Sequence, residues 1–358
     1  MQLTSTIQSL IKDNISSAIQ SKQLTKELLE LAYTENWFNL WVPLDYGGAA
    51  SDLKDGCALL EELAYLDGGI GWTITLCAGA NMFAGYIDPE QAKTIFQTRQ
   101  TCWGGSGKPS GKAELYQDHA VLHGTWKYAT GAPHLTHFTL NAWLYEGGKP
   151  VLGTDGQPLY RSFFVKREDV LIHYDWDTFG LECTASHSFS VEALRVPKSH
   201  SFDLRPEMRT HHGRLFAYPF LTFAECTLAV NYIGMFRRFL DLVERQFFAK
   251  SIDHEWLQNR GRALFRLVDA KRTVLEQQTK RLYELMDITW QDATPNEQHV
   301  SEIAALTRTV VQEIKGATVE LFPSTGITGA QRSEELNIVF RHLFTASQHA
   351  LLNTPVDR

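Results

Sequence analysis

The C-terminal part of the chain carries three apolar-periodic stretches that are too long for a compact mixed domain. They run over residues 215–248, 254–290 and 297–321, with apolar residues at mixed spacings of three and four. A helix of about 30 residues is roughly 45 Å long, which suits an up-and-down helical bundle. A fourth helical stretch runs from about 334 to 352. We therefore predict a C-terminal four-helix bundle over residues 206–358.

The remainder of the chain divides into two parts of different character. Residues 1–100 carry apolar residues at helical spacing, and the stretch from 70 to 86 is almost free of charge, which indicates a buried helix. Residues 101–205 hold short β-rich runs separated by turn signals such as EGGKP at 146–150. We predict an α+β multidomain protein with an N-terminal helical domain (1–100), a small middle β-barrel or sandwich (101–205) and the bundle (206–358).

Charge and composition narrow the functional classes. The formal net charge of −7, a pI near 6.0 and the lack of a Lys/Arg block argue against a nucleic-acid or membrane partner. The N-terminus lacks the features of a secretory signal, and no run of about 18 apolar residues occurs, so we expect a cytoplasmic protein. The five cysteines are scattered, and no Cys/His cluster has metal-ligand spacing, so we expect no metal site.

A glycine-rich stretch stands at the start of the β-domain. The sequence GGSGKPSGK at 104–112 is nearly bare of bulky side chains, so we interpret it as a loop that approaches a polar ligand. It fits neither the phosphate-binding P-loop motif nor the G-x-G-x-x-G dinucleotide motif. A strand over 120–128 follows, which places the ring of Tyr128 two residues before the hydroxyl of Thr130. A plain hairpin connection is the alternative explanation.

Four motifs resemble the acyl-CoA dehydrogenase superfamily. VPLDYGG at 42–48 is similar to its N-terminal loop, and LEELAYLDGGIGW at 60–72 to the helix that follows. GTWKYATGA at 124–132 resembles the flavin strand of this family, and WDTFGLECTASHSFSVEALRVP at 176–197 resembles the signature that closes its β-domain. The order of helical domain, β-domain and four-helix bundle is also the family's. The resemblance covers essentially the whole chain and implies a flavin cofactor, FAD or FMN.

The resemblance implies which residues meet the flavin. The ring of Tyr128 would lie against the isoalloxazine ring, and the hydroxyl of Thr130, next to Gly131, would hydrogen-bond flavin N5. A donor at this position steadies the reduced cofactor in a dry site. Ser106 and Ser110, with the amides around them, would meet the pyrimidine edge or the phosphates.

Two branches of the family differ in their catalytic groups. A dehydrogenase needs a carboxylate that removes the α-proton of an acyl thioester, but the usual Y-E-G-T motif is absent. Glu334 and Glu335 are typical of an acidic first helical turn. Glu225 is the other candidate, although it lies one residue, about 100° around a helix, from the expected register. FRHLFTASQHALL at 340–352 resembles instead the R-D-x-x-T-A-S-Q-H motif of the two-component flavin hydroxylases.

The hydroxylase resemblance singles out a polar stripe on the expected last helix. Arg341, Thr345 and His349 fall at i, i+4 and i+8. We predict Arg341 and His349 as catalytic residues, with His349 as the acid, base or orienting group. We place Thr345 with Ser186 and His187 in the substrate pocket. A hydrogen-bonded core histidine is the alternative for His349, and an exposed hairpin histidine for His187.

Two departures from the family patterns bear on the function. ECTAS at 182–186 stands where many relatives have Arg-Gly-Thr-Gly-Ser, and His342 where the hydroxylases usually have Asp. Our main hypothesis is a monooxygenase that uses reduced flavin and O2 on a small-molecule substrate, with a separate flavin reductase. The second is an acyl-CoA dehydrogenase with Glu225 as base and an electron-transfer flavoprotein as partner, and the third a scaffold protein without flavin. Because the bundles of this family associate, we expect a homotetramer or homodimer.

Overall fold

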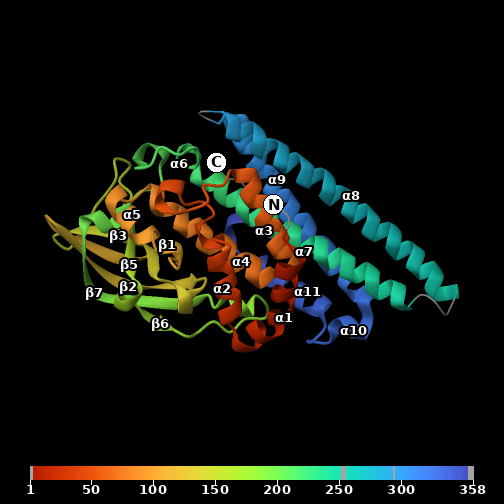
Figure 1. Cartoon of the computed structure of the whole chain (residues 1–358). Helices are drawn as coiled ribbons and strands as arrows, with labels where there is room; N and C mark the ends of the chain where they lie inside the picture. The colour runs from red at the N-terminus through yellow and green to blue at the C-terminus, as the bar shows by residue number, and fades with distance from the viewer. Residues whose placement is uncertain (1–2, 251–254, 293–294, 354–358) are drawn as a thin grey trace.

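The N-terminal helices lie between a β-sheet at one end of the molecule and long helices at the other (Figure 1). The computed structural model describes residues 3–250, 255–292 and 295–353, with side chains described outside 248–260. The N-terminal helices are α1 (Ser5–Ser21), α2 (Lys26–Thr34), α3 (Leu53–Leu66), α4 (Gly68–Asn81) and α5 (Pro89–Phe96). Each begins at a cap whose side chain accepts a backbone N–H, namely Thr4, Thr25, Asp52, Asp67 and Asp88.

Helix α4 is surrounded by protein on almost every side. Only Leu76 and Gly79 among its residues are not buried, which confirms the buried helix predicted from its lack of charge. It packs against α3, the bundle helix α7 (Phe220–Lys250) and strand β1 (Trp103–Leu115). Helix α4 therefore touches all three parts of the fold, and it positions the candidate site described below.

The described part of the chain contains one eight-stranded sheet. The strands after β1 are β2 (His119–Ala129), β3 (His137–Glu146), β4 (Lys149–Pro150), β5 (Tyr160–Lys166), β6 (Leu171–His173), β7 (His187–Pro197) and β8 (Ser201–Phe202). Their order is β6-β7-β2-β1-β3-β5-β8, with β4 on β3. The β1–β3 pair is parallel and shifts register between Ser106 and Gly111, whereas the other pairs are antiparallel.

The glycine-rich stretch forms strand β1 and not an open loop, so this expectation is wrong. A Cβ atom on Gly105 would lie 1.8 Å from the carbonyl oxygen of Thr139, and one on Gly111 would lie 2.0 Å from the Trp126 ring. These glycines allow neighbouring strands and an indole to pack closely. Around Gly107, by contrast, nothing lies within 4 Å of a Cβ position, so this short segment alone among the β1 glycines faces open space.

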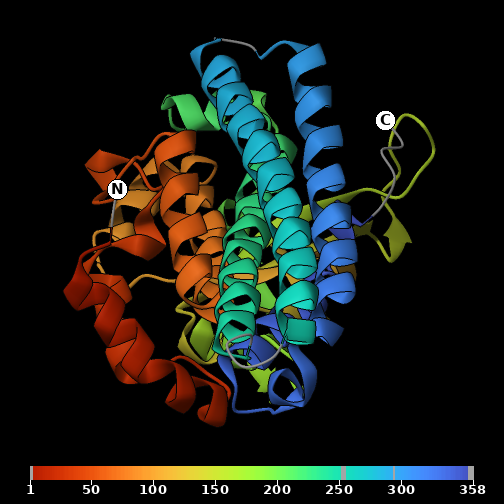
Figure 2. The same cartoon turned by 90° about the vertical axis from the view of Figure 1, so that its right-hand side faces the viewer.

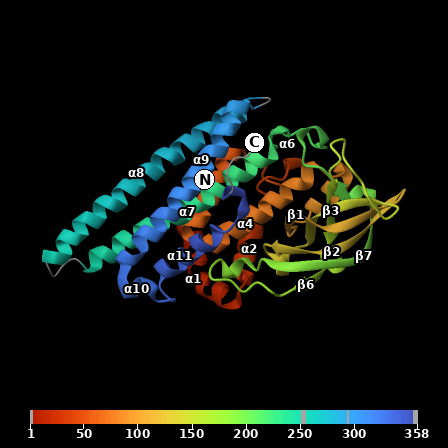
Figure 3. The same cartoon turned by 180° about the vertical axis from the view of Figure 1, so that it is seen from behind.

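The C-terminal helices confirm the predicted bundle. The structure has α6 (Arg214–Ala217), α7, α8 (Glu255–Gln291), α9 (Glu297–Leu321), α10 (Gly326–Ala330) and α11 (Glu335–Ala346). Figure 2 shows α7, α8 and α9 running side by side, and Figure 3 shows α8 on the side of the molecule away from the sheet. None of the described helices combines the length and the apolar character that crossing a membrane requires.

The last helix is shorter than predicted. Helix α11 ends at Ala346, and a 3₁₀ turn over Ala350–Leu352 follows. His349 is the N-terminal cap of this turn, where its Nδ1 accepts a hydrogen bond from the Leu351 amide at 3.4 Å. The prediction that His349 continues a helical stripe with Arg341 and Thr345 is therefore wrong, although the three residues lie on the same C-terminal segment.

Candidate flavin and substrate site

The end of β2 and the start of β7 bring three hydroxyl groups together. The Thr130 hydroxyl lies 2.9 Å from that of Ser186, which lies 2.8 Å from that of Thr184. The Gly131 amide donates to the carbonyl oxygen of Thr184 at 2.8 Å. Thr130 and Ser186 are only 5% and 4% exposed. The fold thus places Thr130 and Gly131, predicted from the resemblance to face the flavin, beside Ser186, predicted to line the substrate pocket.

Tyr128 stands at the edge of these hydroxyl groups in an unusual conformation. Its φ angle is +69°, a value that few residues with a side chain adopt, and 66% of its surface is exposed. Its ring meets the ring of Trp176 edge-on, with centroids 6.2 Å apart. Strained backbone is concentrated at functional sites. An exposed aromatic face next to buried hydroxyls suits a flat, polar-edged ligand, so the residues present fit a flavin.

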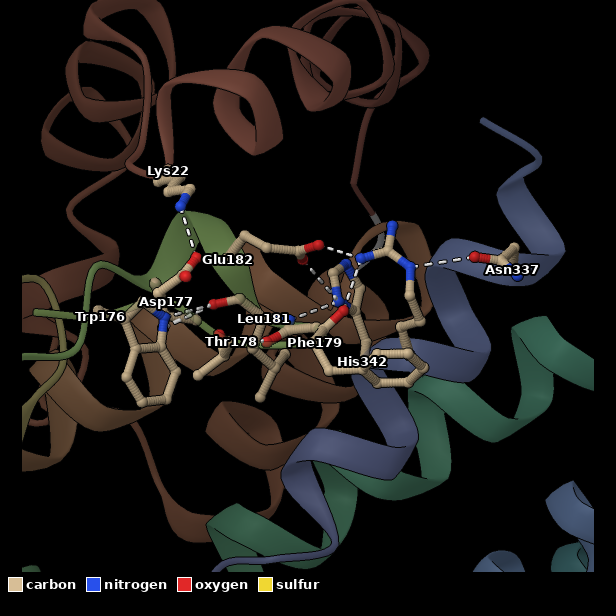
Figure 4. Close-up of polar contacts among 12 residues, drawn as sticks. Lys22, Trp176, Asp177, Thr178, Phe179, Leu181, Glu182, Asn337 and His342 are labelled. Carbon is tan, nitrogen blue, oxygen red and sulfur yellow. Dashed lines mark hydrogen bonds and ion pairs between the residues drawn. The ribbon is translucent and has the colours of Figure 1, made fainter. Parts of the chain in front are cut away.

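A buried arginine ties the loop before β7 (residues 174–186) to the last helix. Figure 4 shows Glu182 of this loop near Asn337 and His342 of that helix. Arg341 on α11 donates through Nη1 to the carbonyl oxygen of Phe179 at 2.7 Å and also to the Glu182 carboxylate, while its Nε donates to Asn337 at 3.0 Å. At the other end of the loop, Asp177 pairs with Lys22, which caps the C-terminal end of α1, at 2.7 Å. These contacts give Arg341 a positioning role for the loop. Direct participation of Arg341 in catalysis stays a prediction.

His342 joins the same loop to α4. Its Nδ1 accepts a hydrogen bond from the Leu181 amide at 2.8 Å and lies 3.8 Å from the Glu182 carboxylate, and its Nε2 lies 3.4 Å from Asp67. Asp67 in turn caps α4 by accepting from the Ile70 amide at 2.9 Å. Burial opposes the charge on Asp67, but nearby His342 and backbone amides keep the pKa of its carboxyl below the usual value.

The two departures from the family patterns meet in this network. The family pattern has Arg where this chain has Glu182, and the hydroxylase motif has Asp where this chain has His342. In these patterns the loop carries the basic residue and the helix the acidic one. In this chain the loop carries the acidic residue and the helix the basic one. The Glu182 carboxylate is held by Arg341, and its second oxygen faces His342. The two residues that differ from the family patterns are therefore neighbours in this structure.

His187 lies inside the fold and not on an exposed hairpin, so that alternative is wrong. It is 7% exposed, its Nδ1 accepts a hydrogen bond from the Trp176 amide at 2.9 Å, and its ring lies 4.9 Å from that of Tyr174. Burial lowers the pKa of His187, against the opposing effect of Asp175 at 4.0 Å. His187 pairs with Ala129 across β7 and β2, and thus lies next to the Thr130 hydroxyl cluster.

Helix α4 connects His349 with Thr130. The His349 ring meets Trp72 of α4 edge-on at 5.6 Å, and burial lowers the pKa of the imidazole. Five positions further along α4, Cys77 Sγ lies 3.7 Å from the carbonyl oxygen of Thr130. Five residues of helix rise about 7.5 Å. The predicted catalytic histidine and the backbone of Thr130 therefore contact the same short stretch of one helix. Thr345 is half-buried on α11.

Glu225 binds an arginine that also holds the turn next to His349. The carboxylate is completely buried on α7 and accepts a hydrogen bond from Arg308 Nη1 of α9 at 2.9 Å. Arg308 Nη2 donates to the carbonyl oxygen of Leu351 at 3.1 Å. The carboxylate predicted as the base of a dehydrogenase is thus engaged by a guanidinium that also holds the C-terminal turn.

The two predicted serines lie along β1. Ser106 is half-buried and pairs with Leu140 of β3, whereas Ser110 is exposed and donates to the carbonyl oxygen of Thr125 at 2.7 Å. Their contact with a cofactor stays a prediction. Sequence reasoning missed the partners that hold the site in place, namely Asp67, Trp72, Asn337 and Arg308. The sequence did carry a signal for part of this network, because residues 182 and 342 both differ from the family patterns.

Comparison with known proteins agrees with this architecture. Residues 2–97 match the family model described as "Acyl-CoA dehydrogenase, N-terminal domain". The structure superposes on XiaF from Streptomyces sp. in complex with FADH2 and glycerol with a TM-score of 0.87, at 20% identity, over 97% of this chain and 90% of that chain. It superposes on 3-HSA hydroxylase from Rhodococcus sp. RHA1 with a TM-score of 0.89, at 15% identity, over 97% and 92%. The chain therefore has the fold of the acyl-CoA dehydrogenase superfamily.

Sequence relatives point to one branch of this superfamily. The chain is 25% identical over 281 residues to indole-3-acetate monooxygenase of Acinetobacter baumannii, which covers 78% of this chain and 70% of the relative. Alignments with further curated relatives span 55% to 81% of their length. Two of these relatives, from Mycobacterium tuberculosis and Rhodococcus jostii, are named flavin-dependent monooxygenase, oxygenase subunit HsaA, at 23% and 22% identity. The resemblance to the hydroxylase branch is thus confirmed, and the similarity favours a monooxygenase over a dehydrogenase or a scaffold.

Proposed function

We propose that the protein is the oxygenase component of a two-component flavin monooxygenase. It receives reduced flavin from a separate reductase and uses O2 to oxygenate a small aromatic substrate. The observation that carries this proposal is the convergence of Tyr128, Thr130 and Ser186 at one end of the sheet, beside the helix that contacts His349. The flavin-dependent monooxygenases among its relatives support the reaction class, and the indole-3-acetate monooxygenase supports an aromatic substrate.

The proposed flavin site uses the residues at the end of β2. The exposed ring of Tyr128 offers a face for the isoalloxazine, and the hydroxyls of Thr130 and Ser186 offer hydrogen bonds to its polar edge. Reduced flavin, when bound, supplies an electron pair and activates O2. Gly131, with φ of +78°, lets the chain turn directly after Thr130 and keeps the hydroxyl of Thr130 beside that of Ser186.

The proposed substrate side uses His349 and the loop before β7. An imidazole whose pKa is lowered by burial is neutral near pH 7, so its unprotonated nitrogen, Nδ1, accepts a proton from a substrate hydroxyl or N–H in exchange for its long 3.4 Å contact with the Leu351 amide. Trp72 packs against this imidazole and fixes its plane. Arg341 and His342 hold the loop that leads to Ser186 and His187, which line the other side of the proposed pocket. The residues of α4 between these groups are mostly buried, which limits the access of water to this side of the proposed pocket.

A binding and oxygen-transfer experiment tests the proposal. The protein is mixed under anaerobic conditions with reduced FAD or reduced FMN, and binding is measured for each. An added flavin reductase then supplies reduced flavin under ¹⁸O2, and phenols and indoles are analysed by mass spectrometry for incorporated ¹⁸O. We expect tight binding of one reduced flavin and one labelled oxygen atom per product. Failure to bind either reduced flavin, or turnover of an acyl-CoA to its enoyl form instead, contradicts the proposal.

Loss of the Thr130 hydroxyl is expected to weaken the binding of reduced flavin. Thr130→Val keeps the shape of the side chain and removes one hydrogen bond, which is worth about 1 kcal/mol or roughly a 5- to 10-fold change in Kd. The matched control is Thr125→Val on the same strand, where the side chain is exposed. Anaerobic titration of both variants with reduced flavin gives the comparison, and an unchanged Kd for Thr130→Val removes Thr130 from the proposed flavin site.

Two further expectations concern partners and compartment. We propose a homotetramer or homodimer, because bundles of this family associate, and light scattering of the purified chain measures the mass directly. We also propose a cytoplasmic location, where reduced flavin and its reductase are available. The electron-transfer flavoprotein expected for a dehydrogenase belongs to the less favoured hypothesis.

A further inference from the structure

A cluster of metal-binding side chains lies beneath the Thr130–Gly131 turn. Cys77 comes from α4, Cys102 from the residue before β1, and His134 from the 3₁₀ turn Ala132–His134. One ligand atom from each, the two sulfurs and a ring nitrogen, lie within 4.8 Å of one another. In the part of the chain that the structure describes, this is the one such group of His, Cys, Asp and Glu residues.

We propose that Cys77, Cys102 and His134 form a binding site for Zn²⁺ that braces the turn carrying Thr130. This proposal revises the expectation of no metal site, which rested on residue spacing along the chain. The three ligands are 25 and 32 positions apart in sequence, and only the fold brings them together.

The separations of the three ligand atoms, none above 4.8 Å, are compatible with three of the four positions of a tetrahedral site. With Zn–S bonds of about 2.3 Å and a Zn–N bond of about 2.0 Å, ligand atoms around the ion lie roughly 3.5 to 3.8 Å apart. The present cluster therefore needs only a small contraction. His134 Nε2 is buried without a well-formed hydrogen bond, and both sulfurs belong to completely buried free cysteines. Two thiolates also neutralise the charge of a divalent ion in a site away from water.

The cluster is continuous with the candidate flavin site. Cys77 Sγ lies 3.7 Å from the carbonyl oxygen of Thr130. A Cβ atom on Gly131 would lie 2.7 Å from His134 Nε2 and 3.1 Å from Cys77 Sγ, so the turn passes directly over the ligand atoms. An ion here fixes α4, the start of β1 and the Thr130 turn to one another. Its role is to position the Thr130 hydroxyl, and its binding does not depend on the proposed function.

Metal analysis of the flavin-free protein tests this site. The untagged, fully reduced chain is incubated with Zn²⁺, passed through a metal-free desalting column and analysed by mass spectrometry for zinc. We expect about one ion per chain, and a Co²⁺-loaded sample should show the thiolate charge-transfer and d–d bands of tetrahedral coordination. Cys77→Ser and His134→Gln should reduce the retained metal to background. The matched control, Cys226→Ser, removes a buried thiol outside the cluster and should retain full binding.

Three results overturn the proposal. Wild-type protein that retains no more zinc than Cys77→Ser shows that the cluster does not bind the ion. Equal loss in Cys226→Ser shows that binding reflects general stability, which circular dichroism of each variant checks independently. A Cys77–Cys102 disulfide in the peptide map of unreduced, zinc-treated wild-type protein, without bound metal, shows that the two thiols form a redox pair. Because no flavin or substrate enters these measurements, failure of this proposal leaves the proposed function untouched.

Discussion

Replacing Arg341 by Met is expected to lower the free energy of unfolding by about 3 to 5 kcal/mol, because it leaves a buried carboxylate without its partner. The Arg341 side chain is 8% exposed and Glu182 is 12% exposed, so neither charge is well solvated. The same change removes the hydrogen bond from Arg341 to the carbonyl oxygen of Phe179 and frees the loop before β7. Urea unfolding followed by circular dichroism measures the loss.

Two further variants identify the cause of this loss. Arg205→Met removes an ion pair with Asp203 whose arginine is 62% exposed, and it should cost less than about 1 kcal/mol. The double variant Arg341→Met/Glu182→Gln should recover part of the stability, because no unpaired carboxylate then remains. If Arg341→Met costs no more than Arg205→Met, the buried network does not hold the loop.

His349→Gln is expected to reduce the rate of substrate oxygenation about 10²- to 10⁴-fold, which is the usual contribution of a general acid or base. This prediction rests on the proposed function and is measured with a substrate found by ¹⁸O labelling. Binding of reduced flavin should change little, because His349 contacts Trp72 and not the Thr130 hydroxyl cluster. The matched control is His123→Gln, an exposed histidine of β2, which should leave the rate unchanged.

The pH dependence gives this residue a distinct signature. Burial lowers the pKa of His349 below its ordinary value of 6.5, so the neutral base is present at pH 7. The rate should stay constant above about pH 6.5 and fall as the pH drops through the lowered pKa. Because the unfolded chain takes up this proton at a higher pH, stability also decreases as the pH falls below 6.5. A His349→Gln enzyme with the wild-type pH profile would exclude His349 as the titrating group.

Local sequence patterns predicted the long bundle helices, the buried helix α4 and strand β2, because each pattern reflects which of its own residues are buried. Helix α9 begins and ends at the predicted residues, Glu297 and Leu321. Strand β1 escaped prediction because glycine has little intrinsic preference for strands. Its glycines are required by Thr139 and Trp126, which lie on other strands. The early end of α11 was likewise invisible, because Tyr232 from α7 hydrogen-bonds the carbonyl oxygen of Ala346 and no helix-breaking residue follows.

In the candidate site, too, some features were predicted from the sequence and others were not. The family resemblance predicted Thr130 and Ser186, and the fold brings their hydroxyls within 2.9 Å. It did not predict that Arg341 holds a loop or that Glu225 is bound to Arg308, because these pairs join residues 159 and 83 positions apart. The cysteine cluster is a similar case. Contacts of this kind depend on packing between domains, and residue spacing along the chain carries no record of them.

Helix α11 holds the loop before β7 in place, and this has a consequence for folding during synthesis. The loop contacts Arg341 and His342 across 159 and 161 positions, so both residues are synthesised long after the loop. Domains fold as they emerge from the ribosome, beginning at the N-terminus, and contacts between distant residues form late. The nascent chain therefore completes its sheet well before α11 can hold the loop in place. The proposed substrate side becomes fixed only after α11 has been synthesised.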